Sequence, residues 1–201
     1  MSHYVYLVRH GEQRDAEHGV VDSPLSERGR RQSELLAERL RGVEFTRALT
    51  SPLDRSRQTA EILADRLAIP SLEESTLLFD CIPSGMDDDT PAIYQRFFAG
   101  IPVEDVEAGA AQMSDAADAF LERTRGDEHT LLITHNFVIG ALIRTALDMP
   151  EWRWLGLNSL NCAITVLRIR STKPAELLVF NDASHLPLEL RTGATQSALP
   201  I

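Results

Sequence analysis

The chain has 201 residues, of which 43% are hydrophobic and 25% are charged, proportions that fit a single globular domain over residues 1–201 with its own core. Its formal net charge of -10 at pH 7 argues against nucleic acid or an anionic membrane as a partner, because both require a basic surface. An anionic substrate would therefore need a concentrated positive pocket on a negative molecule.

Two further features favour a cytoplasmic protein. The N-terminus has no basic segment followed by an apolar stretch, and no apolar run reaches the length of a membrane span. Cys81 and Cys162 lie outside any CxxC pattern, so we expect two reduced thiols rather than a disulfide.

The first strand is predicted at Tyr4–Val8, a run of aromatic and β-branched residues typical of a strand buried on both faces. Arg9, His10 and Gly11 follow it directly. A buried strand has no use for a cation and an imidazole, so we expect the strand to end there and to present both side chains to a cleft. Gly11 has no Cβ and lets the chain turn sharply beside a ligand.

Two helices and a second strand are predicted next. Ser26 is a suitable N-cap for an amphipathic helix over about Glu27–Leu40, and Phe45–Thr50 has the composition of a short strand. Ser51-Pro52 then predicts the N-cap and first position of another helix, with Asp54 three residues past the cap in capping-box register.

The pattern weakens between Ile69 and Pro102, where four prolines and an acidic run predict an irregular cap insertion over about residues 69–102. A short helix is expected within it near Ile93–Phe98. Long segments of this kind are usually functional, often as a lid over a site, and a solvated surface excursion is the alternative.

Regular alternation of helices and strands returns after the insertion. Strands that alternate with helices indicate an α/β fold, here a three-layer αβα sandwich with a mostly parallel central sheet. The predicted elements are a helix over Val103–Arg125, a strand over Thr130–Thr134, a helix over Phe137–Leu147, strands over Ala163–Ile169 and Glu176–Phe180, and a loose polar tail from Gly193.

Charged side chains follow three of the predicted strands. Arg9 and His10 end the first strand, Arg55 stands one turn into the helix after the second, and His135 follows the third. If these strands are parallel neighbours, both arginines and both histidines converge at one edge of the sheet, beside a helix N-terminus. Guanidinium groups and helix N-termini bind phosphate oxygens, so the sequence predicts a site for a phosphate dianion.

Three segments, LVRHGE, SPLDRSRQTAE and LLITHN, resemble in sequence and order the signature segments of the histidine phosphatase superfamily, also called phosphoglycerate-mutase-like, in its phosphatase branch. DSPLSERGRRQ and FNDASHL extend the resemblance through most of the chain. The resemblance implies that His10 is the nucleophile and becomes a phosphohistidine.

Physical chemistry agrees with that role. An attacking imidazole nitrogen must be neutral, and the nearby Arg9 and Arg55 should lower the pKa of His10. The same cations, with His135, would stabilise charge on the transferring phosphoryl group.

Two residues near these segments have open roles. Gln13 either reaches the phosphate or lies at the surface. Asn136 stands where many members of the family carry glycine. Its backbone N–H can still serve the phosphate, and its side chain can cap the following helix.

A general acid is needed to protonate the leaving oxygen, and many members of the family use a glutamate in the stretch that corresponds to Leu77–Gly85. Asp80 is the one carboxylate there in this chain. We therefore expect Asp80 to be the general acid. A loop aspartate that caps a turn is the alternative, which would leave Glu73 and Glu74 as candidates. Glu12 is expected to be structural.

No metal or cofactor is expected. His10, His135 and Asp80 have donor atoms that metals bind, but two arginines beside a metal ion would be repulsive. Of the other histidines, His185 either lines the rim of the site or packs, and three are expected at the surface: His3, His18 and His129.

Three functions remain after this reasoning: a metal-independent phosphomonoesterase, a phosphoglycerate-type mutase, and a non-catalytic phosphate-binding protein. The Glu-containing segment and Trp-Glu-Gly of those mutases are absent between Leu77 and Pro102, and no core residue is lost, so the phosphatase is favoured. Its substrate would be a phosphorylated small molecule or a phosphoprotein. Residues that either form a homodimer contact or belong to the core, with the core favoured, are Trp152, Trp154 and Leu155.

Overall fold

The computed structural model describes residues 1–15 and 22–193. His18 and the tail beyond Gly193 lie outside the described residues. Within the described part, no helix is long and apolar enough to cross a membrane, and Cys81 and Cys162 are both free.

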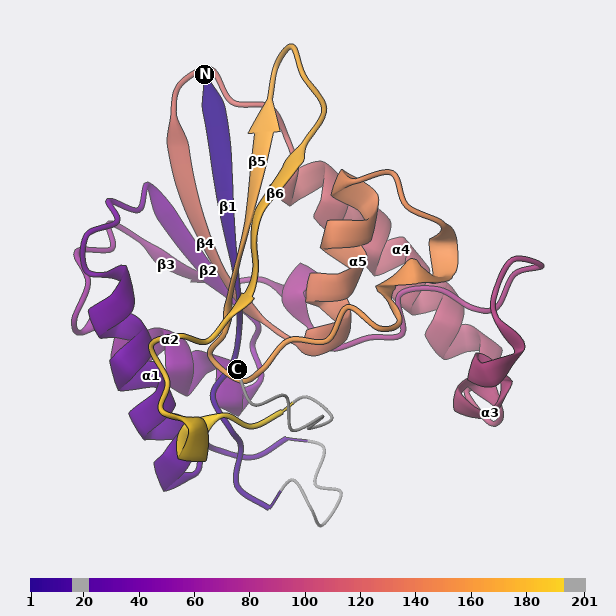
Figure 1. Ribbon diagram of the computed structural model, residues 1–201, viewed down its shortest axis with the longest axis horizontal. Helices are drawn as coiled ribbons and strands as arrows, with labels where there is room; N and C mark the ends of the chain where they lie inside the picture. The colour runs from indigo at the N-terminus through magenta and orange to yellow at the C-terminus, as the bar shows by residue number, and fades with distance from the viewer. Residues whose placement is uncertain (16–21, 194–201) are drawn as a thin grey trace.

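The centre of the molecule is a six-stranded sheet in the order β3-β2-β4-β1-β5-β6 (Figure 1). The pairs β1–β4, β4–β2 and β2–β3 are parallel, whereas β5 is antiparallel to both β1 and β6. Five strands therefore run one way and β5 the other, which confirms the α/β fold with a mostly parallel sheet. The strands are β1 (Ser2–Arg9), β2 (Arg47–Thr50), β3 (Leu72–Glu74), β4 (Glu128–Thr134), β5 (Ile164–Arg170) and β6 (Glu176–Asp182).

Helices cover both faces of this sheet, α1 and α2 on one side and α4 and α5 on the other (Figure 1). The α-helices are α1 (Glu27–Leu40), α2 (Asp54–Ala64), α3 (Gln95–Phe98), α4 (Val103–Phe120) and α5 (Asn136–Ala146). Short 3-10 helices are η2 (Thr76–Leu78), η3 (Ala92–Tyr94), η4 (Glu151–Trp154) and η5 (Leu188–Leu190).

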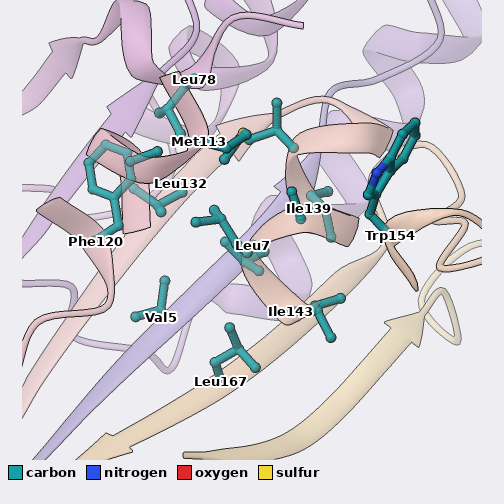
Figure 2. Packing of buried hydrophobic residues seen from close by; sticks show 14 of the residues in the cluster. Val5, Leu7, Leu78, Met113, Phe120, Leu132, Ile139, Ile143, Trp154 and Leu167 are labelled. Atoms are coloured by element: carbon teal, nitrogen blue, oxygen red, sulfur yellow. The ribbon is translucent and has the colours of Figure 1, made fainter. Parts of the chain in front are cut away.

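Each face of the sheet has its own apolar core. Successive strand residues point to opposite faces, so Val5 and Leu7 of β1 pack toward α4 and α5 while Val8 packs toward α1 and α2. Figure 2 shows the first of these cores, where side chains of β1, β4 and β5 meet those of α4 and α5, and Leu78 joins them from η2. The burial of Leu78 in this core attaches the segment after β3 to the rest of the protein.

The expected short helix near Ile93–Phe98 is present as η3 followed by α3, which projects from the rest of the molecule (Figure 1). Trp154 is 2% exposed, and its Nε1 donates a hydrogen bond of 2.8 Å to Ser84 Oγ, while Leu155 joins the same core. For these two residues the core interpretation is therefore correct.

The start of α2 differs from the prediction. The helix begins at Asp54, with Leu53 and not Ser51 at the N-cap, and no capping side chain. Ser51 is buried and its Oγ bonds to the ring of His135 instead. The capping-box interpretation of Ser51 and Asp54 is therefore wrong.

Three other predictions fail for local reasons. The irregular segment after Ile69 contains β3, a strand of three exposed residues that joins the sheet edge beside β2. Helix α4 ends at Phe120 and not Arg125, and just beyond its end the Glu122 carbonyl accepts a hydrogen bond from the ring of His3. His3 is itself 2% exposed and also contacts Thr130 Oγ1 at 2.8 Å, so it is buried and not at the surface.

Candidate active site

The strand register brings the predicted site residues to one edge of the sheet. Arg9 of β1 lies opposite Thr134 of β4, and Ile133 of β4 lies opposite Thr50 of β2. The next residue in each strand is therefore His10, His135 or Ser51, and all three emerge side by side. The backbone N–H of His10 continues the ladder by donating to the Thr134 carbonyl at 3.0 Å.

Gly11 lets the chain leave β1 against helix α1. A Cβ at this position would lie 2.6 Å from the Gly29 carbonyl oxygen, closer than real Cβ contacts allow. The Gly11 N–H donates to Thr59 Oγ1 of α2 at 3.0 Å, so the turn is anchored to both helices on that side. The turn fixes where the imidazole of His10 can lie.

The His10 ring is held in one tautomer. Its Nδ1 lies 2.7 Å from the Gly11 carbonyl, which can only accept, so Nδ1 carries the proton. Its Nε2 in turn accepts from Arg55 Nε at 3.1 Å. Burial, followed by the charges of Arg9 and Arg55, lowers the pKa of His10 well below its usual value. The ring is therefore neutral at pH 7, with a lone pair on Nε2.

Arg55 contacts most of the other polar groups of the site. Its side chain is 5% exposed, and its NH2 group lies 3.4 Å from Asp80 Oδ2 and 3.2 Å from His135 Nδ1. Its NH1 group donates to Asp22 Oδ1 at 3.2 Å. One guanidinium thus contacts both histidines and both carboxylates.

His135 is neutral for similar reasons. The arginine donates to Nδ1, so the proton sits on Nε2, which lies 2.9 Å from Ser51 Oγ. Burial lowers the pKa of His135 well below its usual value; the nearby His10 ring opposes a second proton in the same pocket, and the charges of Arg55 and Arg9 add to the effect. The rings of His10 and His135 have centroids 5.0 Å apart.

Asp80 lies at the opening of the site, with 44% of its side chain exposed. Its Oδ2 is 4.0 Å from His135 Nδ1. Loss of hydration raises the pKa of Asp80, while Arg55 and Arg9 act in the opposite direction. A carboxyl with a raised pKa beside two buried imidazoles is suited to hold and release a proton.

Helix α4 holds the segment that carries Asp80. Gln112 Nε2 donates to the carbonyls of Leu77 and Phe79 at 3.2 and 2.8 Å. Gly109 lies so close to this segment that a Cβ would be 2.0 Å from the Ile82 carbonyl oxygen. The fallback candidates Glu73 and Glu74 are exposed on β3 and are absent from the described residues that line the site cavities.

Arg9 is fixed by backbone carbonyls. Its NH1 group donates to the Ser159 carbonyl at 2.7 Å and also contacts the Gly193 carbonyl. Burial lowers the pKa of Arg9 to about 10, so it remains a cation at neutral pH. Asn161 completes this corner, because its Nδ2 donates to the His10 carbonyl at 2.8 Å.

A cavity of about 340 Å³ opens above these groups. A larger cavity of about 530 Å³ adjoins it, and both are lined by Arg55 and Asp80. The first cavity is lined by Arg9, His10, Glu12, Gln13, Arg55, Asp80, Asn161, Thr192 and Gly193. Gln13 therefore lies at the site, and Glu12 also accepts a 2.8 Å hydrogen bond from the Ser26 hydroxyl at the start of α1.

The side chain of Asn136 does not cap helix α5. Its Oδ1 accepts from the Ser159 N–H at 2.7 Å and its Nδ2 donates to Asn158 at 3.0 Å. Helix α5 has no side-chain cap, so the predicted capping role is wrong. Asn136 instead fastens the loop whose Ser159 carbonyl holds Arg9.

Two remaining histidines lie away from the site. His129 is half-buried and stacks on Tyr4 with ring centroids 4.8 Å apart. His185 is half-buried beside Leu186 and lines neither cavity of the site. Across residues 1–15 and 22–193, no group of three or more His, Cys, Asp or Glu side chains could hold a metal ion.

The sequence model of the histidine phosphatase superfamily (branch 1) matches residues 5–182. A protein of Cronobacter sakazakii named probable phosphoglycerate mutase GpmB is 32% identical over 178 residues, which cover 80% of this chain and 82% of that protein.

Solved structures share the fold. The alpha-ribazole phosphatase of Shigella flexneri has a TM-score of 0.67 at 19% identity, covering 89% of this chain and 96% of the other. The phosphoserine phosphatase of Entamoeba histolytica, solved with 3-phosphoglyceric acid, has a TM-score of 0.71 at 22% identity, covering 92% of this chain and 100% of the other.

Proposed function

This chain belongs to branch 1 of the histidine phosphatase superfamily, and on that premise we propose that it is a metal-independent phosphomonoesterase that acts through a phosphohistidine on His10. The observation that carries the proposal is the state of this ring: it is buried and neutral, its Nδ1 proton is directed to the Gly11 carbonyl, and its Nε2 lone pair faces the Arg55 guanidinium. An imidazole in that state is ready to attack phosphorus.

The first half-reaction forms the phosphoenzyme. The phosphate dianion binds between Arg9 and Arg55, and Arg55 Nε exchanges its bond to His10 for a phosphoryl oxygen. Nε2 of His10 then attacks phosphorus while the bond from phosphorus to the ester oxygen breaks. Asp80 gives its proton to that oxygen, which leaves as an alcohol.

The second half-reaction releases phosphate. Asp80, now a carboxylate, accepts a proton from water, whose oxygen attacks phosphorus as the bond to Nε2 breaks. His10 returns to its neutral form and the two arginines hold the product until it dissociates. The substrate is a phosphorylated small molecule or a phosphoprotein, and the two free cysteines support a cytoplasmic location as part of the same proposal.

A mutase is the second candidate, favoured by the name of the 32% identical relative. In a mutase, an acceptor hydroxyl and not water takes the phosphoryl group from His10. Release of inorganic phosphate in stoichiometric amounts from a monoester, with no transfer to added alcohol or phosphoglycerate, identifies a phosphatase.

The proposal predicts that His10→Ala abolishes turnover and leaves the fold intact, because this side chain serves the site more than the core. After brief exposure to labelled substrate and an alkaline denaturing quench, the parent protein should retain a base-stable, acid-labile label. The same amount of label on the His10→Ala variant would show that the nucleophile lies elsewhere.

A further inference from the structure

The larger cavity beside the phosphate site is lined mostly by residues that the smaller cavity does not have. It shares only Arg55 and Asp80 with the smaller cavity, and it extends beneath helix α4. A phosphate held by Arg9 and Arg55 would direct its ester oxygen past Asp80, so the organic part of the substrate would enter this cavity. The lining of the larger cavity therefore determines which esters fit.

Most of that lining is apolar. Phe79, Ile82 and Phe137 supply large apolar side chains, and α4 adds Ala108, whose side chain is small. A volume of about 530 Å³ is far more than a three-carbon group needs and suits a ring-sized group. A small polar ester would leave much of this apolar surface in contact with water.

Two carboxyl groups and one cation line the cavity. Among the described residues that line it, Arg55 is the one cation, and it already contacts Asp22 and Asp80. Asp105, near the start of α4, adds a further carboxylate. A second anionic group on the substrate would face these carboxylates with no cation of its own to bind.

From this lining we propose that the enzyme selects phosphomonoesters of apolar, ring-sized alcohols and discriminates against esters that carry a carboxylate or second phosphate. This rests on the proposed phosphatase function and names its substrate class. Phosphoglycerate, the substrate named for a relative of this chain, would be a poor substrate, because its carboxylate would lie in a cavity lined by Asp105.

Binding of phosphonates tests the proposal without requiring turnover. Calorimetry on the parent protein should give an affinity for benzylphosphonate at least about tenfold higher than for 2-carboxyethylphosphonate, because the ring buries apolar surface and the ligand carboxylate meets the carboxylate of Asp105. Equal affinities, or tighter binding of the carboxylate ligand, would overturn the proposal.

Filling the cavity provides a matched comparison. Ala108→Trp should weaken benzylphosphonate about tenfold or more while changing the affinity for inorganic phosphate by less than about twofold. Ala110→Trp, two residues along the exposed surface of α4 and outside the cavity lining, should change neither. Unchanged benzylphosphonate binding to Ala108→Trp would show that the ring lies elsewhere.

Reversing the charge at the rim tests discrimination. Asp105→Lys should improve 2-carboxyethylphosphonate binding several-fold at low salt, whereas Asp115→Lys, an equal charge change farther along α4, should not. Equal gains in both variants would contradict a specific role of Asp105. Turnover is a separate result: hydrolysis of phosphoglycerate in preference to benzyl phosphate overturns the selectivity alone, whereas absence of any phosphoenzyme overturns the proposed function.

Discussion

Arg55 connects every reactive group of the site, since its guanidinium contacts His10, His135, Asp22 and Asp80. A guanidinium can do this because its five donors point in fixed directions within one plane. Lysine carries the same charge as a point and cannot donate to all of these partners. The geometry at Arg55 therefore matters as much as its charge.

This leads to a prediction for the two site arginines. Arg55→Lys and Arg9→Ala should each lower kcat/KM and vanadate affinity on the order of tenfold to a hundredfold, since a charge-assisted contact contributes roughly 1.5–3 kcal/mol. Arg57→Ala is the control, because Arg57 lies on the same helix but pairs at the surface with Asp54 and Glu74. Undiminished vanadate affinity in both site variants would count against the clamp.

The role of Asp80 can be tested with substrates whose leaving groups differ in their need for a proton. Asp80→Asn should slow alkyl phosphates roughly a hundredfold to ten-thousandfold but hardly affect nitrophenyl phosphate, whose leaving oxygen needs little protonation. The raised pKa of Asp80 means that the acid form persists to higher pH than in an ordinary aspartate. Activity on the alkyl ester should therefore fall as pH rises through that pKa, and this limb should vanish in the variant.

An equal and small loss on both esters would instead make Asp80 a loop residue. Glu73 and Glu74 would not be the natural replacements, because they lie on β3 outside the site cavities. Measurement of kcat for both esters over the same pH range distinguishes these outcomes.

Residues at strand ends were predictable from the sequence, whereas their supporting residues were not. Arg9, His10 and His135 each follow a recognisable buried strand, which is a local pattern. Ser159 and Gly193 hold Arg9 through backbone carbonyls, so their side-chain types carry no signal. Asn161 and Asp22 act across long sequence separations, and only the folded chain places them at the site.

At the scale of elements, α4 and the segment from Leu77 to Ile82 pack tightly against each other. The helix contacts the segment through Gln112 and through the close approach at Gly109. The position of Asp80, the proposed general acid, thus depends on a helix whose sequence carries no catalytic residue type at these two places.

Gly109→Ala should therefore disturb both stability and proton transfer. The new methyl group would meet the Ile82 carbonyl at 2.0 Å, and such overpacking typically costs about 1–3 kcal/mol. We expect kcat on alkyl esters to fall more than kcat on nitrophenyl phosphate, because Asp80 is displaced. Gly42→Ala, where a Cβ would meet nothing within 4 Å, is the control.

The element boundaries show where local sequence signals are overridden. Ser51 is a residue type that favours the N-cap, yet its hydroxyl bonds to His135 and the helix begins at Asp54. Strand β3 has only three exposed residues and becomes a strand by pairing with β2, which no periodic pattern reveals. The buried strands β1 and β4, in contrast, follow from their own composition.

At the scale of the whole molecule, the site reduces stability at low pH. The pKa values of His10 and His135 are both lowered in the folded state, chiefly by burial. Below the ordinary histidine pKa of about 6.5, the unfolded chain binds protons that the folded chain does not. Proton uptake therefore favours unfolding as the pH falls, and the two histidines together should cost roughly 2–3 kcal/mol between about pH 7.5 and 5.5.

Urea unfolding of the parent protein at these two pH values should show this loss, and His10→Ala should remove about half of it. The raised pKa of Asp80 has the opposite sign, because its contribution to stability is lost as pH rises, so Asp80→Asn should make the loss at low pH steeper or leave it unchanged. A free energy of unfolding that is flat from pH 7.5 to 5.5, in both the parent protein and His10→Ala, would show that the buried imidazoles take up protons as readily as exposed ones. Burial would then not be what keeps the nucleophile of the proposed mechanism neutral.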